Sequence, residues 1–310
     1  MSNGEVMYKK IRALSVGAVL WDVIGDQEYI GGAPYNVAVN LKKLGAESMF
    51  VTRVGTDARG DRAVEEMRRC GVGTGFVQRD PVFPTGVALA TLDGAGNASY
   101  EIPHASFDEI CLTEKDINAL NAFAPDVVCF GSFEQRCEKS RLAVRSVLER
   151  VRAKTVFFDV NIRMGFCERE VFDFCFRHTD VLKLNEDECA LLSFLLYGEK
   201  MEPAAFGKKT IAEYGVSVVL VTLGAAGCFV CTEKAQASVP TEPVKSADTI
   251  GAGDAFSGAF LYAYLSGKDP VSAAKCGNAL GAYVAQRTGA LPAFDEEIVA
   301  RLEKMTASED

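Results

Sequence analysis

The feature that most constrains the fold of this chain is a recurring alternation between short apolar runs and longer segments with helical periodicity. Apolar runs of strand length occur along most of the sequence, at Ile11–Val19, Met49–Val54, Asp126–Gly131, Thr155–Val160, Val181–Leu184, Val218–Leu223 and Gly227–Cys231. Helical periodicity is expected at 34–44, Ala58–Cys70, Glu138–Arg152, Asp187–Leu196, Pro203–Tyr214, Asp254–Leu265, Pro270–Arg287 and Asp295–Lys304. Such an order is typical of a doubly wound α/β fold, and it predicts a mostly parallel sheet flanked by helices.

Three further runs differ from this pattern because they are short, alternate in polarity and are separated by proline or glycine. They are Phe76–Gln78, Gly86–Leu92 and Ala98–Ile102. They predict a small antiparallel patch, to which Ile24–Ile30 would add a hairpin. We therefore expect one domain over residues 1–310, with a β lid built from about residues 20–32 and 76–104. Because exposed strands favour a cover, a homodimer through the lid is also expected.

Composition narrows the class of partner. The chain of 310 residues has 33 Lys and Arg against 42 Asp and Glu, a net charge of −9, and no dense basic run. This excludes a nucleic-acid or anionic-membrane surface and favours a small ligand. The ten cysteines lack paired metal-binding spacing, which favours a reducing compartment. The longest uncharged stretch, Val216–Thr232, is interrupted by glycine and is short for a bilayer span of ~20 residues. We expect a cytoplasmic protein.

The two histidines, His104 and His178, lie far apart in the sequence. Neither has a second histidine or a CxxC pair close enough to form a recognisable ligand pattern. The sequence alone therefore gives no argument for a metal site at either histidine.

The most informative polar segment is Asp248–Gly258, in which Gly251, Ala252 and Gly253 precede Asp254. Glycines before a helix allow successive backbone N–H groups to converge, and the first-turn donors of a helix have no internal partner. The segment thus predicts an anion site, with Asp254 as the base of a phosphoryl transfer. An ordinary helix start with an acid in its first turn explains the same residues. Both interpretations remain open at this level.

Polar side chains also follow most of the predicted strands. Because ligands of open α/β sheets bind beyond the carboxyl ends of the strands, these residues are expected along one edge. Arg163 could neutralise an anion, Asn185 could meet phosphates, and Glu188 could act through Mg²⁺ and its waters. Simpler roles are a surface ion pair for Arg163 and a solvated first-turn acid for Glu188. Likewise, Asp22 could cap a turn, and Thr222, Gly224 and Gly227 could form only a tight turn.

Motifs of other nucleotide enzymes do not occur. The chain has no GxxxxGK[ST], no HRD with DFG, no GxGxxG after the first strand and no GxSxG. This speaks against P-loop enzymes, protein kinases, dinucleotide dehydrogenases and α/β-hydrolases.

Two long segments resemble the signatures of the ribokinase-like (phosphofructokinase-B type) carbohydrate kinases. Asp248–Ala259 is similar to the carboxy-terminal signature of that family. Gly31–Ala38, followed by Leu44-Gly45 and by Gly55, Asp57 and Gly60, is similar to the amino-terminal one. The resemblance extends over nearly the whole chain, and it is strongest to the fructokinases, for example in Phe158–Arg163.

The resemblance implies a ribokinase-like fold and ATP-dependent phosphorylation of a sugar hydroxyl, with D-fructose to fructose 6-phosphate as the most similar reaction. By the family's motifs Asp254 would be the base, and the amides of Gly251, Ala252 and Gly253 the anion hole. Glu188 would serve Mg²⁺. The ATP site would be lined by Asn185, Thr222, Gly224, Gly227 and Asn278, and the sugar site by Asp22, Gly32, Asn36 and Arg163. A monovalent cation such as K⁺ would lie beside Asp248 and Ile250.

Three residues depart from the pattern usual in fructokinases. Tyr35 stands where a smaller residue is frequent, and Phe133 and Glu134 replace a Leu-Ala pair; all could reshape the sugar pocket. A kinase of the same fold for a 2-keto-3-deoxy sugar acid, ribose or a nucleoside is therefore a second hypothesis. A third is a non-catalytic sugar- or nucleotide-sensing protein, against which Asp254 speaks because a binding module needs no base.

Overall fold

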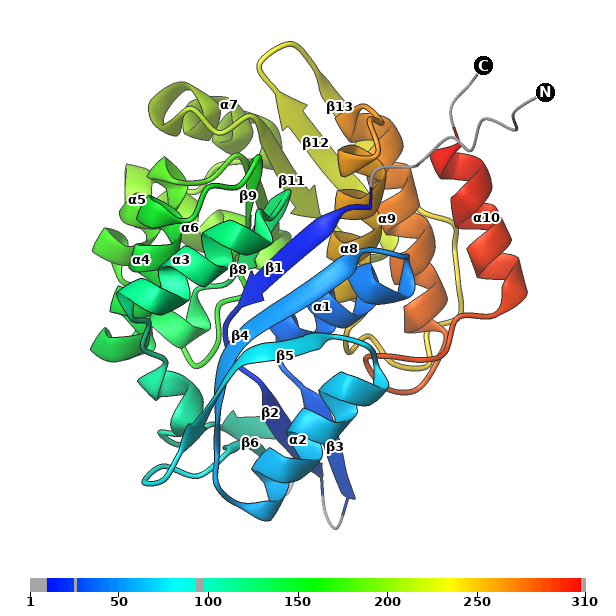
Figure 1. Ribbon diagram of the computed structural model, residues 1–310. Coiled ribbons are helices and arrows are strands. Elements are labelled where there is room, and N and C mark those ends of the chain that lie inside the picture. Colours follow the sequence, from blue (N-terminus) through cyan, green and yellow to red (C-terminus); the bar gives the residue numbers. More distant parts are fainter. Residues whose placement is uncertain (1–9, 25–26, 93–97, 308–310) are drawn as a thin grey trace, which may run out of the picture.

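The architecture centres on a nine-stranded sheet in the order β13-β12-β11-β10-β9-β8-β1-β4-β5 (Figure 1). The structure is a computed structural model that describes residues 10–24, 27–92 and 98–307. From β11 to β5 neighbouring strands are parallel, whereas β12 and β13 are antiparallel at one edge. The strands are β1 Arg12–Val16, β4 Glu47–Gly55, β5 Gly73–Asp80, β8 Val127–Phe130, β9 Thr155–Asp159, β10 Val181–Asn185, β11 Val218–Thr222, β12 Cys228–Thr232 and β13 Gln236–Val239.

Helices cover both faces of this sheet. They are α1 Ala33–Lys43, α2 Ala58–Arg69, α3 Glu114–Phe123, α4 Glu138–Arg150, α5 Arg169–Arg177, α6 Glu186–Tyr197, α7 Pro203–Tyr214, α8 Ala252–Leu265, α9 Pro270–Ala285 and α10 Glu296–Thr306. One hydrophobic cluster joins the sheet to α1, α8, α9 and α10, and a second joins the opposite face to α3–α7 (Figure 1). Short 3-10 turns occupy Ser106–Glu109 (η1), Phe133–Arg136 (η2) and Gly224–Ala226 (η3). The predicted doubly wound fold is confirmed.

A second sheet of four strands, in the order β3-β2-β6-β7, lies beside α2 (Figure 1). Its strands are β2 Leu20–Ile24, β3 Gln27–Gly31, β6 Gly86–Leu92 and β7 Ala98–Glu101. The pairs β2–β3 and β6–β7 are antiparallel, as predicted, but β2 and β6 are parallel. Residues 25–26 and 93–97, which fall within the expected lid, lie outside the described residues.

Two boundary predictions were wrong. Phe76–Gln78 belongs to β5, which pairs in parallel with β4 at the edge of the large sheet and takes no part in the small one. Ile11–Val19 is not one strand, because the chain leaves the large sheet after Val16 and enters the small sheet at Leu20.

The helices α3 and α5 and the strand β13 were not predicted. In the sequence of α5, charged residues alternate with the apolar ones, so the helical period is hard to recognise. In the structure, the apolar face packs on the sheet through Phe172 and Phe176.

No helix within the described ranges has both the length and the apolar character required to cross a lipid bilayer.

Gly17 explains why the first apolar run is divided. Its φ is +151°, a conformation that side chains disfavour. A Cβ at this position would lie 2.6 Å from Pro34 Cγ and 2.7 Å from Glu134 Oε1. The chain can therefore turn from β1 to β2 only where no side chain is present.

We predict that Gly17→Ala lowers the free energy of unfolding by roughly 1–3 kcal/mol, because the added methyl group meets two packed side chains at once. Chemical denaturation followed by circular dichroism measures the change. Gly75→Ala in β5 is the matched control, since nothing lies within 4 Å of its Cβ position. Equal stability of the two variants would contradict this account of the turn.

Candidate active site

The start of α8 meets the carboxyl ends of the parallel strands, as the sequence predicts. Gly251 is the N-cap of α8, with φ +78°, and a Cβ there would lie 2.5 Å from Ala290 Cα. Glycine is therefore required at this turn. The first turn of α8 presents backbone N–H groups that have no partner within the helix. The amide of Ala252 differs, because it donates to the Thr249 carbonyl at 3.2 Å.

Asp254 lies in this first turn and is half-buried. The Nδ2 group of Asn36, a buried residue on α1, donates to Asp254 Oδ2 at 2.8 Å. Burial and the nearby Asp159 carboxylate raise the pKa of Asp254 to about 6, against the opposing effect of Lys183, Asn36 and Arg163. Its carboxylate is thus oriented by Asn36 and is a better proton acceptor than an ordinary aspartate.

The remaining residues predicted to meet substrate approach from two other elements. Asp22 lies within β2, and burial raises its pKa to about 6, partly offset by Arg163. The exposed side chain of Arg163, in the loop after β9, therefore lies near enough to influence both Asp22 and Asp254. Gly32 is the N-cap of α1, and its carbonyl accepts the Asn36 amide at 2.9 Å. The structure brings these predicted sugar-facing residues into one neighbourhood.

Asn185 and Glu188 form a capping box at the start of α6. Asn185 Oδ1 accepts the Glu188 amide at 2.8 Å, and Glu188 Oε2 accepts the Asn185 amide at 2.9 Å. Glu188 Oε1 also accepts the amide of Ile162 at 2.8 Å. With an exposed fraction of 7%, Glu188 is no solvated surface acid. Its burial raises its pKa above the usual value. Glu188 therefore links α6 to the loop after β9.

The residues predicted to line a nucleotide site lie next to this capping box. Thr222 ends β11 and is the register partner of Asn185 in β10. Gly224 and Gly227 form the turn into the antiparallel β12, where the Leu223 amide donates to the Gly227 carbonyl at 2.8 Å. Asn278 on α9 donates to the Val239 carbonyl at 2.8 Å, so its amide holds the end of β13. The tight-turn interpretation of the two glycines is therefore correct as local structure.

Sequence reasoning missed a buried ion pair beneath Asp254. Lys183 Nζ on β10 lies 3.0 Å from both carboxylate oxygens of Asp159 on β9. Ser257 Oγ, one turn after Asp254 on α8, donates to Asp159 Oδ2 at 2.8 Å. Burial acts to lower the pKa of Lys183, but Asp159, Asp254 and Glu188 raise it above its usual value. A lysine inside the apolar run Val181–Leu184 was the available signal, because buried lysines are almost always paired.

Lys183 also explains the glycine at position 253. Its Nζ lies 3.2 Å from the point where a Cβ of Gly253 would be. The ammonium group therefore lies directly against the first turn of α8, and it adds a fixed positive charge to the unpaired amides.

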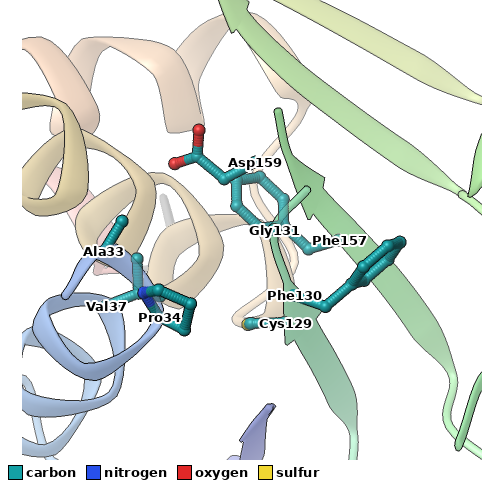
Figure 2. Close-up of a pocket in the computed structure, with 8 residues that line it drawn as sticks. All are labelled: Ala33, Pro34, Val37, Cys129, Phe130, Gly131, Phe157 and Asp159. Carbon is teal, nitrogen blue, oxygen red and sulfur yellow. The ribbon is translucent and has the colours of Figure 1, made fainter. Parts of the chain in front are cut away.

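Asp159 also lines a small cavity of about 10 Å³, which is large enough for about one water molecule (Figure 2). Gly131, directly after β8, and Asp159, the last residue of the neighbouring strand β9, face Ala33 and Pro34 at the start of α1. This cavity connects the buried ion pair with the amino-terminal glycine segment.

Of the three departures from the fructokinase pattern, Glu134 bonds directly to a residue that lines this cavity, Gly131. Tyr35 is fully buried and packs against Phe50, and Phe133 packs against Phe107. Glu134 Oε1 accepts the Gly131 amide at 2.8 Å, and burial raises the pKa of Glu134 to about 7. The expectation that Tyr35 reshapes the pocket is therefore wrong, since its ring points into the core.

Known proteins resemble the chain over nearly its full length. A model described as pfkB family carbohydrate kinase matches residues 4–297. An uncharacterized sugar kinase from Archaeoglobus fulgidus is 30% identical over 257 residues, covering 81% of this chain and 96% of that protein. A fructokinase from Xylella fastidiosa with bound ATP is 25% identical, with a TM-score of 0.84 over 94% of this chain and 98% of that one. A fructokinase from Vibrio cholerae with fructose, ADP and calcium is 27% identical, with a TM-score of 0.76 over 96% and 99%.

We predict that Lys183→Met raises the pKa of Asp254 above its value of about 6 by roughly one unit, because an opposing positive charge is lost. A ¹³C NMR titration of the aspartate carboxyl carbons, assigned with Asp254→Asn, measures it. Lys183→Arg is the control and should keep the lower value. An unchanged or lower pKa in Lys183→Met would contradict the electrostatic coupling.

Proposed function

Because the chain belongs to the pfkB family of carbohydrate kinases, we propose that it transfers the γ-phosphoryl group of ATP to a hydroxyl of D-fructose, forming fructose 6-phosphate. The observation that carries this proposal is Asp254, held by Asn36 at the start of α8. This carboxylate stands beside the unpaired amides of the first helical turn and the Lys183 ammonium group. A proton acceptor within a positively polarised cradle is what phosphoryl transfer to an alcohol requires.

In this mechanism Asp254 orients the sugar hydroxyl and accepts its proton. A loose transition state asks for little basicity, so a pKa of about 6 is sufficient at neutral pH. Charge on the transferring group is stabilised by the amides of Gly251 and Gly253 and by Lys183. Removing one such donor typically costs about 10²–10³ in rate. The Ala252 amide would have to leave the Thr249 carbonyl before it could contribute.

The donor set around α6 fits a Mg²⁺–ATP complex. Glu188 offers a carboxylate whose oxygens each keep a lone pair after accepting one amide, as contact with Mg²⁺ through water requires. Mg²⁺ would neutralise charge on the phosphates. Asn185, Thr222 and Gly224 would lie along the nucleotide, and Asn278 would support it by holding Val239. The monovalent cation is proposed beside Asp248, whose carboxylate accepts the amides of Ile250 and Gly289.

Charge around the sugar site favours a neutral substrate. Asp22, Glu134 and Asp254 are carboxyl groups whose pKa is raised, and Arg163 is the cation that influences two of them. A 2-keto-3-deoxy sugar acid would bring a further negative carboxylate close to these carboxyl groups, and like charges repel. A hexose with several hydroxyls can instead donate to the carboxylates and accept from Asn36. The neighbours named fructokinase support D-fructose among such sugars.

We predict that D-fructose is turned over with a kcat/KM at least roughly tenfold above that of ribose, a 2-keto-3-deoxy sugar acid or a nucleoside. Coupled detection of ADP over this panel measures it. Strong turnover of another member without turnover of D-fructose would replace the substrate and keep the reaction. Binding of sugar without any ADP release would instead support the non-catalytic sensor.

We predict that Asp254→Asn lowers kcat by roughly 10²–10⁴-fold, because the proton acceptor is lost, while the Kd for ADP changes little. Steady-state assays and calorimetric titration measure the two quantities. Asp61→Asn makes the same change in the first turn of α2, at an exposed position, and should keep full activity. Survival of more than about 5% of the rate in Asp254→Asn would remove Asp254 from this role.

A further inference from the structure

One cluster of metal-ligating side chains lies outside the site described above. His104 follows β7, Asp108 lies in η1, and Cys137 is the N-cap of α4. One potential ligand atom from each lies within 4.8 Å of the others, and it is the one such group found among the described residues. We propose that His104, Asp108 and Cys137 form a binding site for a borderline-soft divalent cation of the zinc type.

The distances fit tetrahedral coordination. His104 Nδ1 lies 3.5 Å from Cys137 Sγ and 3.7 Å from Asp108 Oδ2. A tetrahedral Zn²⁺ with its usual bond lengths separates a sulfur and a nitrogen ligand by about 3.6 Å, so little movement is required. A thiolate, an imidazole and a carboxylate together select zinc-type ions over Mg²⁺, which prefers oxygen ligands alone. Water would complete the coordination on the exposed side of His104.

The surrounding residues support the histidine as a ligand. His104 Nε2 lies 2.9 Å from Glu109 Oε1, and Glu109 Oε2 is held by Lys139 at 2.9 Å. A carboxylate on the far nitrogen of a histidine fixes the tautomer that leaves Nδ1 free for a metal. Glu109 is thus a positioning residue that touches no ion.

Two features oppose binding of the cation. Arg136 donates through Nε to Asp108 Oδ1 at 2.8 Å and through Nη2 to Oδ2 at 2.7 Å. The amide of Ala105 also donates to Oδ2 at 2.9 Å. The cation competes with this amide and with Nη2 for Oδ2, while Nε can keep Oδ1. Burial and the Asp108 carboxylate also raise the pKa of the Cys137 thiol to about 11. Binding therefore releases a proton from Cys137.

The place of the cluster gives the ion a mechanical effect. His104 lies on the segment that returns the chain from β7 of the small sheet, and Cys137 begins a helix on the large sheet. Arg136 already bonds the Ile102 carbonyl of the same segment at 2.8 Å. A bound cation adds a further connection between this segment and the start of α4. It stabilises the folded chain because the three ligands converge only in the folded state.

The test is a Co²⁺ titration of the full chain in Mg²⁺ buffer without nucleotide. We expect a thiolate-to-cobalt charge-transfer band that saturates at one equivalent and disappears when Zn²⁺ is added, together with a rise in Tm on Zn²⁺ binding. Glu109→Gln should keep the band but weaken binding by roughly tenfold or more, as loss of a partner behind a histidine ligand does.

Cys137→Ser should abolish the band, and His104→Gln should abolish or strongly weaken it. Serine at the N-cap of α4 favours the helix, so the first variant should fold as well as the parent. Cys111→Ser, which removes an exposed thiol outside the cluster, is the matched control and should keep the band. A band that persists in Cys137→Ser, that is lost in Cys111→Ser, or that never forms in the parent would overturn the proposal.

Discussion

The candidate site depends on one buried ion pair, that between Lys183 and Asp159. Two charges taken out of water are expensive unless each is paired and hydrogen-bonded, and here both conditions are met. The ammonium contacts both carboxylate oxygens, and the carboxylate also accepts the Ser257 hydroxyl. The pair thus joins β9, β10 and α8 at the point where the helix begins. Its positive member lies against Gly253, while its negative member raises the pKa of Asp254. This one ion pair therefore positions the start of α8 and also influences the pKa of Asp254.

Much of this arrangement could be predicted from the sequence, because each prediction rested on a local signal. The apolar runs predicted the parallel strands, and the glycines before Asp254 predicted a helix start with unpaired amides. Strand-end reasoning placed Asn185 and Thr222 along one edge of the sheet, and the register of β10 and β11 makes them direct neighbours there. These inferences succeed because backbone hydrogen bonding and burial of apolar faces leave few alternatives for such segments.

What could not be predicted depends on contacts between distant segments. The run Ile11–Val19 resembles one strand in sequence, but β1 ends at Val16, and Gly17 has a φ that side chains disfavour and leaves no room for a Cβ beside Pro34 and Glu134. Phe76–Gln78 alternates between apolar and polar residues because it lies in β5, a partly covered strand at the edge of the large sheet. In sequence, such an edge strand looks the same as a strand of a small antiparallel sheet. Tyr35 was expected to reshape the pocket because fructokinases often carry a smaller residue at this position, yet its ring packs on Phe50. His104 appeared isolated because its companions Asp108 and Cys137 meet it only in the folded chain.

The turn at Gly17 has a consequence for how the two sheets can move. β1 passes into β2 across residues 17–19, so the small sheet grows out of a central strand of the large one without a flexible tether. A domain on a long linker explores many orientations, whereas a sheet continued from its neighbour's own strand has a short axis about which it can swing. The positions that the small sheet can take are therefore set by the place of β1 in the core. Any rotation about this short connection would carry Asp22, three residues beyond it, along a path set by the position of β1.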